Sequence, residues 1–244
     1  MVLEPTEARN YWRALLDNAT QLIADATLLH NADSHGRARA LTVLAEEELG
    51  KATSVYDLFS HSWSAQETEP LELEQRSSRD HLAKYIAAFE FGRELEMFWG
   101  GDYPDIPEDD NWERWYEEQK AEAATAARAA NLQKQRGFYV DMANGEMTTP
   151  RDFDVEDVAE HLERAAGVIE MMLIKDHTRM QDEPPERYDS THALQWRVMP
   201  AAHGLEYQMF IESMRETIEQ DARADGSGPN RDGTDAATAS TDGV

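Results

Sequence analysis

Hydrophobic residues recur at spacings of three and four along most of the chain, which is the pattern of helices that bury one face. The first helix is predicted over residues 4–30, and Ser34 can cap a second helix that ends near Trp63. A third helix is predicted from about Leu71 to Trp99. The buried stripe of the first helix is expected to comprise Trp12, Leu15, Leu16, Ala19, Leu22, Ile23, Ala26 and Leu29.

The pattern changes after the third helix, where turn-forming residues gather. Residues 100–110, GGDYPDIPEDD, predict a loop, and a fourth helix is predicted over residues 111–136. In the segment 137–150, β-forming residues precede the turn pair Asn144-Gly145, so we expect an extended segment or a small hairpin. Two further helices are predicted: one capped by Asp152 or Asp154 and running to about Met180, and a final one from about Thr191 to Ala222.

The last residues have a different composition from the rest of the chain. Residues 223–244 contain almost no large apolar side chain and much Gly, Asp, Ser and Thr. Such a segment cannot bury enough apolar surface to offset the entropy of ordering, so we expect a disordered acidic tail. Residues 1–222 are expected to form a single all-α domain, a helical bundle with one short extended or hairpin insert.

Charge narrows the classes of partner. The chain has 244 residues and a formal net charge of -26, with 49 acidic and 23 basic side chains. This field disfavours non-specific binding to nucleic acid and suits a protein that works at high salt. At about 1 M salt the Debye length falls to about 3 Å, so a local basic cleft could still meet RNA. The absence of cysteine excludes disulfides and thiolate metal sites.

Hydropathy bears on the location of the protein. No stretch approaches the roughly 20 apolar residues of a membrane-spanning helix. The first residues, MVLEPTEARN, lack the basic start and apolar run of a secretory signal. We therefore expect a cytoplasmic protein without membrane association.

A charged run interrupts the second helix. Glu46, Glu47 and Glu48 are followed by Leu49, and then directly by Gly50 and Lys51. A charged triplet on a helix is ordinarily a solvated face. Here the neighbouring apolar residues imply that much of the helix is buried, so at least one acid should face the interior or an interface and need a partner. Gly50, which has no side chain, would let the backbone of another helix come close.

A second group of charged residues lies in RSSRDHLAKY, residues 76–85. His81 and Lys84 are three residues apart on one helix face, and Arg76 lies five residues before the histidine. An ordinary amphipathic helix accounts for the pattern. The functional alternative is a phosphodiester site, because histidine exchanges protons near neutral pH and arginine binds phosphate through a bidentate fork. No HExxH or paired ExxH spacing predicts a metal site.

Aromatic residues also repeat in the fourth helix. Trp112, Trp115 and Tyr116 lie close together in the sequence and form one stripe. We expect this stripe in the core or at an interface.

In combination, these motifs resemble the AbiV family of abortive-infection proteins over about residues 10–180. The resemblance rests on Asn18-Ala19, Asp25-Ala26, Glu47-Glu48-Leu49-Gly50-Lys51, His81 with Lys84, and Tyr139-Val140-Asp141 ahead of Pro150. That family is similar to the HEPN superfamily of small helical bundles. Many HEPN proteins are metal-independent ribonucleases of antiviral defence and toxin systems, and active members usually pair as dimers.

The resemblance implies a function and a site. The HEPN motif is an arginine followed, after four to six residues, by a histidine, and Arg76 and His81 fit that spacing. Ser77 departs from the Asn, Asp or His that often follows the arginine. By resemblance we expect an antiviral endoribonuclease that acts on RNA as a homodimer, without metal or cofactor. The alternative is a non-catalytic binding or sensor module that acts on a phage or host protein.

The catalytic residues expected are Arg76 and His81. A supporting polar seam is expected to comprise Glu47, Glu48, Lys51, Lys84, Asn18 and Asp25. For this seam to form, the second and third helices must pack together and bring Glu47, Glu48 or Lys51 close to His81 or Lys84.

Overall fold

The computed structural model describes residues 1–73, 81–98, 111–143, 145–181 and 191–204, with 209 and 213. Arg76, the loop predicted at 100–110, most of the final helix beyond 204 and the tail at 223–244 lie outside the described residues. Contacts between residues divide the chain into a unit of Met1–Gly204 and a second unit of Leu205–Val244. The fold described below is that of the first unit.

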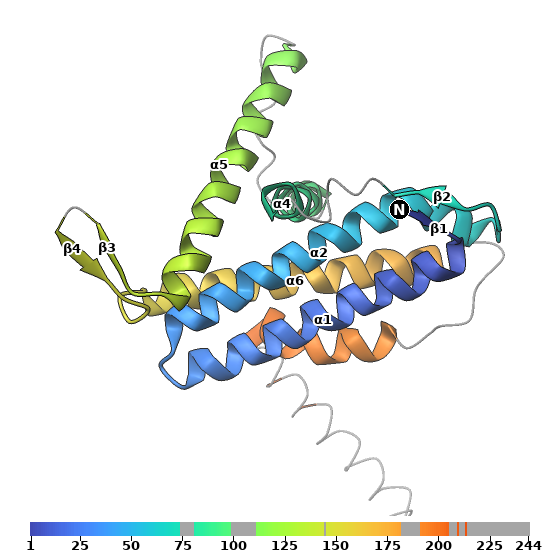
Figure 1. Ribbon diagram of the computed structural model, residues 1–244. Coiled ribbons are helices and arrows are strands. Elements are labelled where there is room, and N and C mark those ends of the chain that lie inside the picture. The colour runs from blue at the N-terminus through green and yellow to red at the C-terminus, as the bar shows by residue number, and fades with distance from the viewer. Residues whose placement is uncertain are drawn as a thin grey trace, which may run out of the picture. The chain divides into compact units, whose positions relative to one another are not determined.

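Most of the described residues are helical, as the sequence predicts (Figure 1). The helices are α1 (Pro5–Asn31), α2 (His35–Ser64), α4 (His81–Phe98), α5 (Trp112–Phe138), α6 (Val155–Arg179) and a helical segment at 191–204. Asp154, one of the two predicted caps, accepts hydrogen bonds from the backbone N–H groups of Glu156 and Asp157 at the start of α6. Among the predicted helix boundaries that fall on described residues, all are confirmed to within a few residues except the start of the third helix. The predicted end of the final helix near Ala222 lies outside the described residues.

The start of the third helix was placed wrongly by the periodicity. Leu71 and Glu72 form a strand, β2 (Leu71–Glu72), which pairs antiparallel with β1 (Val2–Leu3). Residues 74–80 lie outside the described residues, and α4 is described from His81. The apolar-polar-apolar order of Leu71, Glu72 and Leu73 suits this strand, because both leucines pack against the core. A strand of two residues is too short to produce a recognisable period of two.

The predicted hairpin follows α5. Strands β3 (Asp141–Ala143) and β4 (Glu146–Thr148) are antiparallel, with Met142 opposite Met147. Gly145 has a φ of 84°, a conformation that glycine adopts without steric cost, so the turn residue falls where the sequence predicts it.

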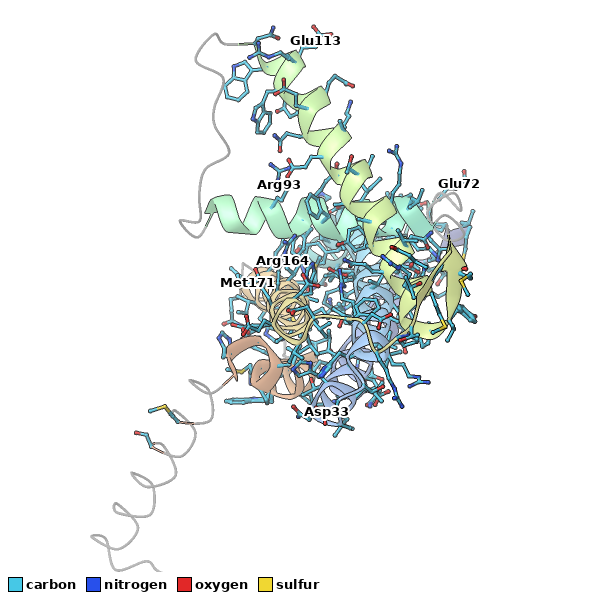
Figure 2. The ribbon with its side chains drawn as sticks, turned by 90° about the vertical axis from the view of Figure 1, so that its left-hand side faces the viewer. Asp33, Glu72, Arg93, Glu113, Arg164 and Met171 are labelled. Atoms are coloured by element: carbon cyan, nitrogen blue, oxygen red, sulfur yellow. The ribbon has the colours of Figure 1, made fainter. Side chains whose placement is uncertain are left out.

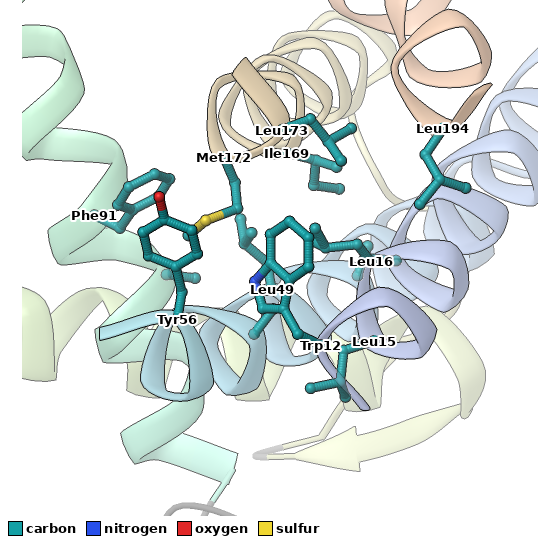
Figure 3. Close-up of a cluster of buried hydrophobic side chains, with 14 of the residues drawn as sticks. Trp12, Leu15, Leu16, Leu49, Tyr56, Phe91, Ile169, Met172, Leu173 and Leu194 are labelled. Carbon is teal, nitrogen blue, oxygen red and sulfur yellow. The ribbon is translucent and has the colours of Figure 1, made fainter. Parts of the chain in front are cut away.

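The main core lies between α1, α2, α6 and the segment at 191–204, and Ala88 and Phe91 of α4 also contribute to it (Figure 3). Trp12 is completely buried at its centre and lies beside the rings of Tyr56 and Trp63. Burial of each large apolar side chain stabilises the fold by roughly 1.5–3 kcal/mol. This core holds α2 in place and leaves one of its faces for α4 and α5.

An ion cluster closes one end of the core. Asp176 of α6 is fully buried and accepts two hydrogen bonds from the guanidinium of Arg9, at 2.8 and 2.7 Å, and one from Nε of Arg179, at 3.0 Å. The Arg9 guanidinium also lies 4.6 Å from the ring centre of Trp12. Both carboxylate oxygens are thus satisfied, and α1 is fixed to α6.

Two glycines permit close packing on the remaining face of α2. A Cβ on Gly50 would lie 1.7 Å from the main-chain oxygen of Lys84, and one on Gly137 of α5 would lie 2.2 Å from the oxygen of Gly36. Helices α4 and α5 therefore reach the backbone of α2 itself. Farther toward its N-terminus, α5 leaves the bundle (Figures 1 and 2). Within the described part of the chain, every helix is too short or too polar to span a bilayer.

Candidate functional site

The site lies where α4 and α5 cross α2. Glu47 of α2 is 4% exposed and makes contacts with both crossing helices. Its Oε2 lies 2.7 Å from Nδ1 of His81, the first residue of α4. Its Oε1 forms an ion pair with Nζ of Lys134 on α5. One buried carboxylate therefore connects three helices and has a partner on each oxygen.

The contact with Glu47 fixes which nitrogen of the His81 ring is available to accept a proton. A carboxylate accepts hydrogen bonds, so Nδ1 of His81 carries the ring proton and donates a hydrogen bond to Oε2 of Glu47. In the neutral ring, Nε2 then holds the lone pair and can accept a proton. The His81 side chain is 59% exposed although its partner is buried, so the imidazole is both oriented and accessible.

Three lysines surround this pair. Lys134 binds Glu47, Lys51 pairs with Glu48, and Lys84 is only 6% exposed. Burial lowers the pKa of Lys84, and repulsion from Lys51 lowers it further, while Glu47 and Glu48 act in the opposite direction. Three lysines are therefore gathered around two glutamates in a chain whose net charge is -26.

The three consecutive glutamates have three different environments. Glu47 faces His81, Glu48 faces Lys51, and Glu46 lies on another side of α2 with its Oε2 3.6 Å from Nη1 of Arg39. This separation follows from the rotation of about 100° between successive helical residues. The charged run is thus not a single solvated face.

Glu46 belongs to a second buried polar cluster. Arg39 is 1% exposed, and within the described chain its Nε and Nη1 atoms have no hydrogen-bond partner. Burial raises the pKa of Glu46, although Arg39, Arg164 and His161 favour its charged form. The pKa of Tyr85 is raised to about 12, by burial first and by the charge of Glu46 second. The sequence showed no sign that Arg39 would be buried, because arginine in an amphipathic helix is ordinarily exposed.

The predicted approach of the second and third helices is confirmed, since Glu47 contacts His81 and Gly50 contacts the backbone of Lys84. Two members of the expected seam do not join it. Asn18 is exposed on α1, and Asp25 accepts a hydrogen bond from Gln21 of the same helix. Among the described residues, neither Asn18 nor Asp25 is a hydrogen-bond or ion-pair partner of His81 or Glu47.

Lys134 was missed by the sequence reasoning. It lies in an alanine-rich helix with many charged residues, and nothing in its spacing distinguishes it from the other lysines. Only the crossing of α5 over α2 brings it to Glu47, which is 87 residues away in the chain. Among the side chains that the structure describes, no group of three or more potential metal ligands is gathered in one place.

Comparisons with known proteins agree with the motifs and the fold. The chain matches the family HEPN_AbiV, described as AbiV, over residues 7–170. This range contains most of α1, the whole of α2, α4 and α5, and α6 except for its last turns. No curated protein and no solved structure gives a match. The family match spans more than half of the chain and includes the whole of the site around Glu47 and His81. The chain therefore belongs to the AbiV family of HEPN proteins.

Proposed function

We propose that this protein is an antiviral endoribonuclease of the HEPN type, in which His81 exchanges a proton with RNA. The observation that carries the proposal is the 2.7 Å contact between an exposed histidine and a buried carboxylate. A carboxylate that holds an imidazole in one tautomer and orientation is a recurrent device of general base catalysis. The family match supports the antiviral context.

The chemistry requires one proton to be removed and one to be supplied. Nε2 of His81 takes the proton of the RNA 2′-hydroxyl, whose oxygen attacks the neighbouring phosphorus. The bond from phosphorus to the 5′-oxygen breaks, that oxygen takes a proton, and a 2′,3′-cyclic phosphate remains. Glu47 stabilises the imidazolium that forms, and in a homodimer the second His81 supplies the proton to the leaving oxygen.

Cationic groups would stabilise the charge that develops on phosphate. Lys84 follows His81 by one helical turn on α4, and Lys51 lies near it on α2. Arg76 is assigned the role of phosphate fork from the sequence motif. High salt would weaken the repulsion between RNA and the acidic remainder of the surface.

The test is RNA cleavage by the full-length protein across a salt series. Wild type should cut single-stranded RNA and leave cyclic phosphate ends, and His81→Ala should lower the rate by about 10²–10⁴-fold. His61→Ala is the matched control, because His61 is a histidine of α2 whose side chain is 86% exposed. Equal cleavage by wild type and His81→Ala, or no cleavage at any salt, would refute the proposal.

A non-catalytic binding module is the second candidate, and a specific observation favours it. Both carboxylate oxygens of Glu47 have a partner, Oε1 in Lys134 and Oε2 in His81. The cluster therefore also serves as a structural connection between helices. The two candidates separate in a phage challenge with total RNA examined. Loss of protection in cells carrying His81→Ala supports the nuclease, whereas protection that persists with intact RNA supports the binding module.

A further inference from the structure

The first turns of α5 carry aromatic side chains at the surface of the protein. Trp112 is 46% exposed and Tyr116 is 58% exposed, and Trp115 lies beside both. The first buried residue of α5 is Ala123, so about three turns of the helix precede its first buried residue. Figure 2 shows Glu113, next to Trp112, at the end of α5 far from the bundle. We call Trp112, Trp115 and Tyr116 the aromatic face.

The three rings of the aromatic face support each other. Trp112 and Trp115 meet edge to face with their centres 6.0 Å apart, and Trp115 and Tyr116 do so at 5.1 Å. Edge-to-face pairs fix ring orientation and leave a π surface of the outer rings in solvent. Of the two positions expected for this stripe, the core is wrong for Trp112 and Tyr116, and the interface stays a prediction. Exposed tryptophan and tyrosine of this kind are typical of the residues that contribute most to protein interfaces.

Acidic residues surround the aromatic face. Over residues 112–122 there are four glutamates and two basic residues, and both bases pair within the helix, Arg114 with Glu118 and Lys120 with Glu117. This end of α5 therefore combines π surface with negative charge.

That combination selects one kind of occupant. Nucleic acid is repelled by the carboxylates, and a second copy of this surface would bring like charges together. A guanidinium or ammonium group gains from both features, because it is attracted to the ring faces within about 6 Å and to the carboxylates. We propose that the aromatic face binds a basic, arginine-bearing segment of a partner protein. This surface is separate from His81 and does not depend on the proposed nuclease activity.

The test measures binding of a labelled synthetic peptide to the full-length protein by fluorescence anisotropy. The peptide alternates arginine with glycine and serine, and its comparison peptide carries uncharged citrulline in place of each arginine. Trp112→Ala combined with Tyr116→Ala should weaken binding of the arginine peptide by about tenfold. The citrulline peptide should bind neither protein.

Trp196→Ala is the matched control, because Trp196 is 52% exposed on a different helix and its loss also leaves the net charge unchanged. It should bind the arginine peptide as wild type does. If the double variant binds as wild type does, or if Trp196→Ala weakens binding equally, attraction is due to general charge and the proposal is overturned.

Two further outcomes identify another occupant and also overturn the proposal. One is a wild-type dimer in light scattering that becomes a monomer in the double variant, which would assign the face to a second copy. The other is binding of a labelled RNA that is lost in the double variant. Circular dichroism of the double variant confirms that helix content is retained, as expected for two exposed substitutions.

Discussion

Gly50 and Lys84 meet backbone to backbone: a Cβ on the glycine would lie 1.7 Å from the carbonyl oxygen of the lysine. No real Cβ can approach an oxygen so closely, so only glycine at position 50 allows α4 to cross α2 at this distance. The crossing sets the position of His81, which lies one helical turn before Lys84 and contacts Glu47, one turn before Gly50. The order of acid, glycine and lysine in the second helix thus has a geometric reason.

Gly50→Ala should therefore separate the two helices. We expect it to lower the free energy of unfolding by about 1–3 kcal/mol, since the methyl group meets backbone rather than a flexible side chain. Gly167→Ala in α6 is the matched control, because a Cβ there meets nothing within 4 Å. That change should raise stability by about 0.5–1 kcal/mol through helix propensity. Urea unfolding of both variants measures the contrast, and equal shifts would contradict the close crossing.

Glu47→Gln tests whether the carboxylate acts through His81. The amide cannot stabilise an imidazolium, so RNA cleavage should fall by about 10²-fold. If the acid works only through the histidine, the double variant with His81→Ala should be no slower than His81→Ala alone. Glu160→Gln, at an exposed position of α6, should leave the rate unchanged. Multiplicative losses in the double variant would show that Glu47 acts on RNA separately.

Lys134→Met removes the second partner of the same carboxylate. Glu47 then keeps a buried charge with only the imidazole to compensate it, and we expect a loss of about 3 kcal/mol in unfolding free energy. Lys120→Met is the control on the same helix, because the ion pair of Lys120 with Glu117 is exposed to solvent. Its stability should match that of wild type. A Lys134 variant as stable as the control would show that the pair is not needed to hold α5.

Glu46 predicts a pH dependence with a definite sign. Burial raises the pKa of this carboxyl in the folded state above its ordinary value of 4.5, so the folded state binds the proton more tightly than the unfolded state does. The stabilisation that protonation of Glu46 gives the folded state is present below pH 4.5 and is lost as the pH rises through the pKa of the folded state. Wild type should therefore lose stability relative to Glu46→Gln over that interval, as followed by urea unfolding at successive pH values. A stability difference that stays constant or changes in the opposite direction would contradict it.

Assembly should respond to salt in the direction set by net charge. Two chains at -26 each repel, so a homodimer formed through the face that carries α4 must rely on apolar contact and should strengthen as salt screens the repulsion. An RNA complex should weaken over the same series, because salt competes with its phosphate contacts. Light scattering across the series measures the first effect. A monomer at every salt, or a dimer that dissociates as salt rises, would contradict the paired-site arrangement.

Periodicity alone predicted most of the helices, because long amphipathic stripes dominate the burial of this chain. The role of Gly50 could also be anticipated, since glycine within a buried helix indicates close approach of another backbone. The pairing of Glu47 with Lys134 could not be anticipated, because it depends on the angle at which α5 crosses α2. The strand at Leu71 was too short to show a period, and the burial of Arg39 contradicts the ordinary tendency of its side chain.

The order of elements along the chain has a consequence for protein synthesis. Glu47, His81 and Lys134 all precede α6, yet α6 supplies Ile169, Met172 and Leu173 to the core on which α1 and α2 pack. A ribosome therefore releases the reactive groups before it releases the helix that completes their support. Nascent chains that end before α6 carry the histidine and its acid without the framework that holds them together. Under the proposed function, the site could therefore cleave RNA near the ribosome only after synthesis of the domain is nearly complete.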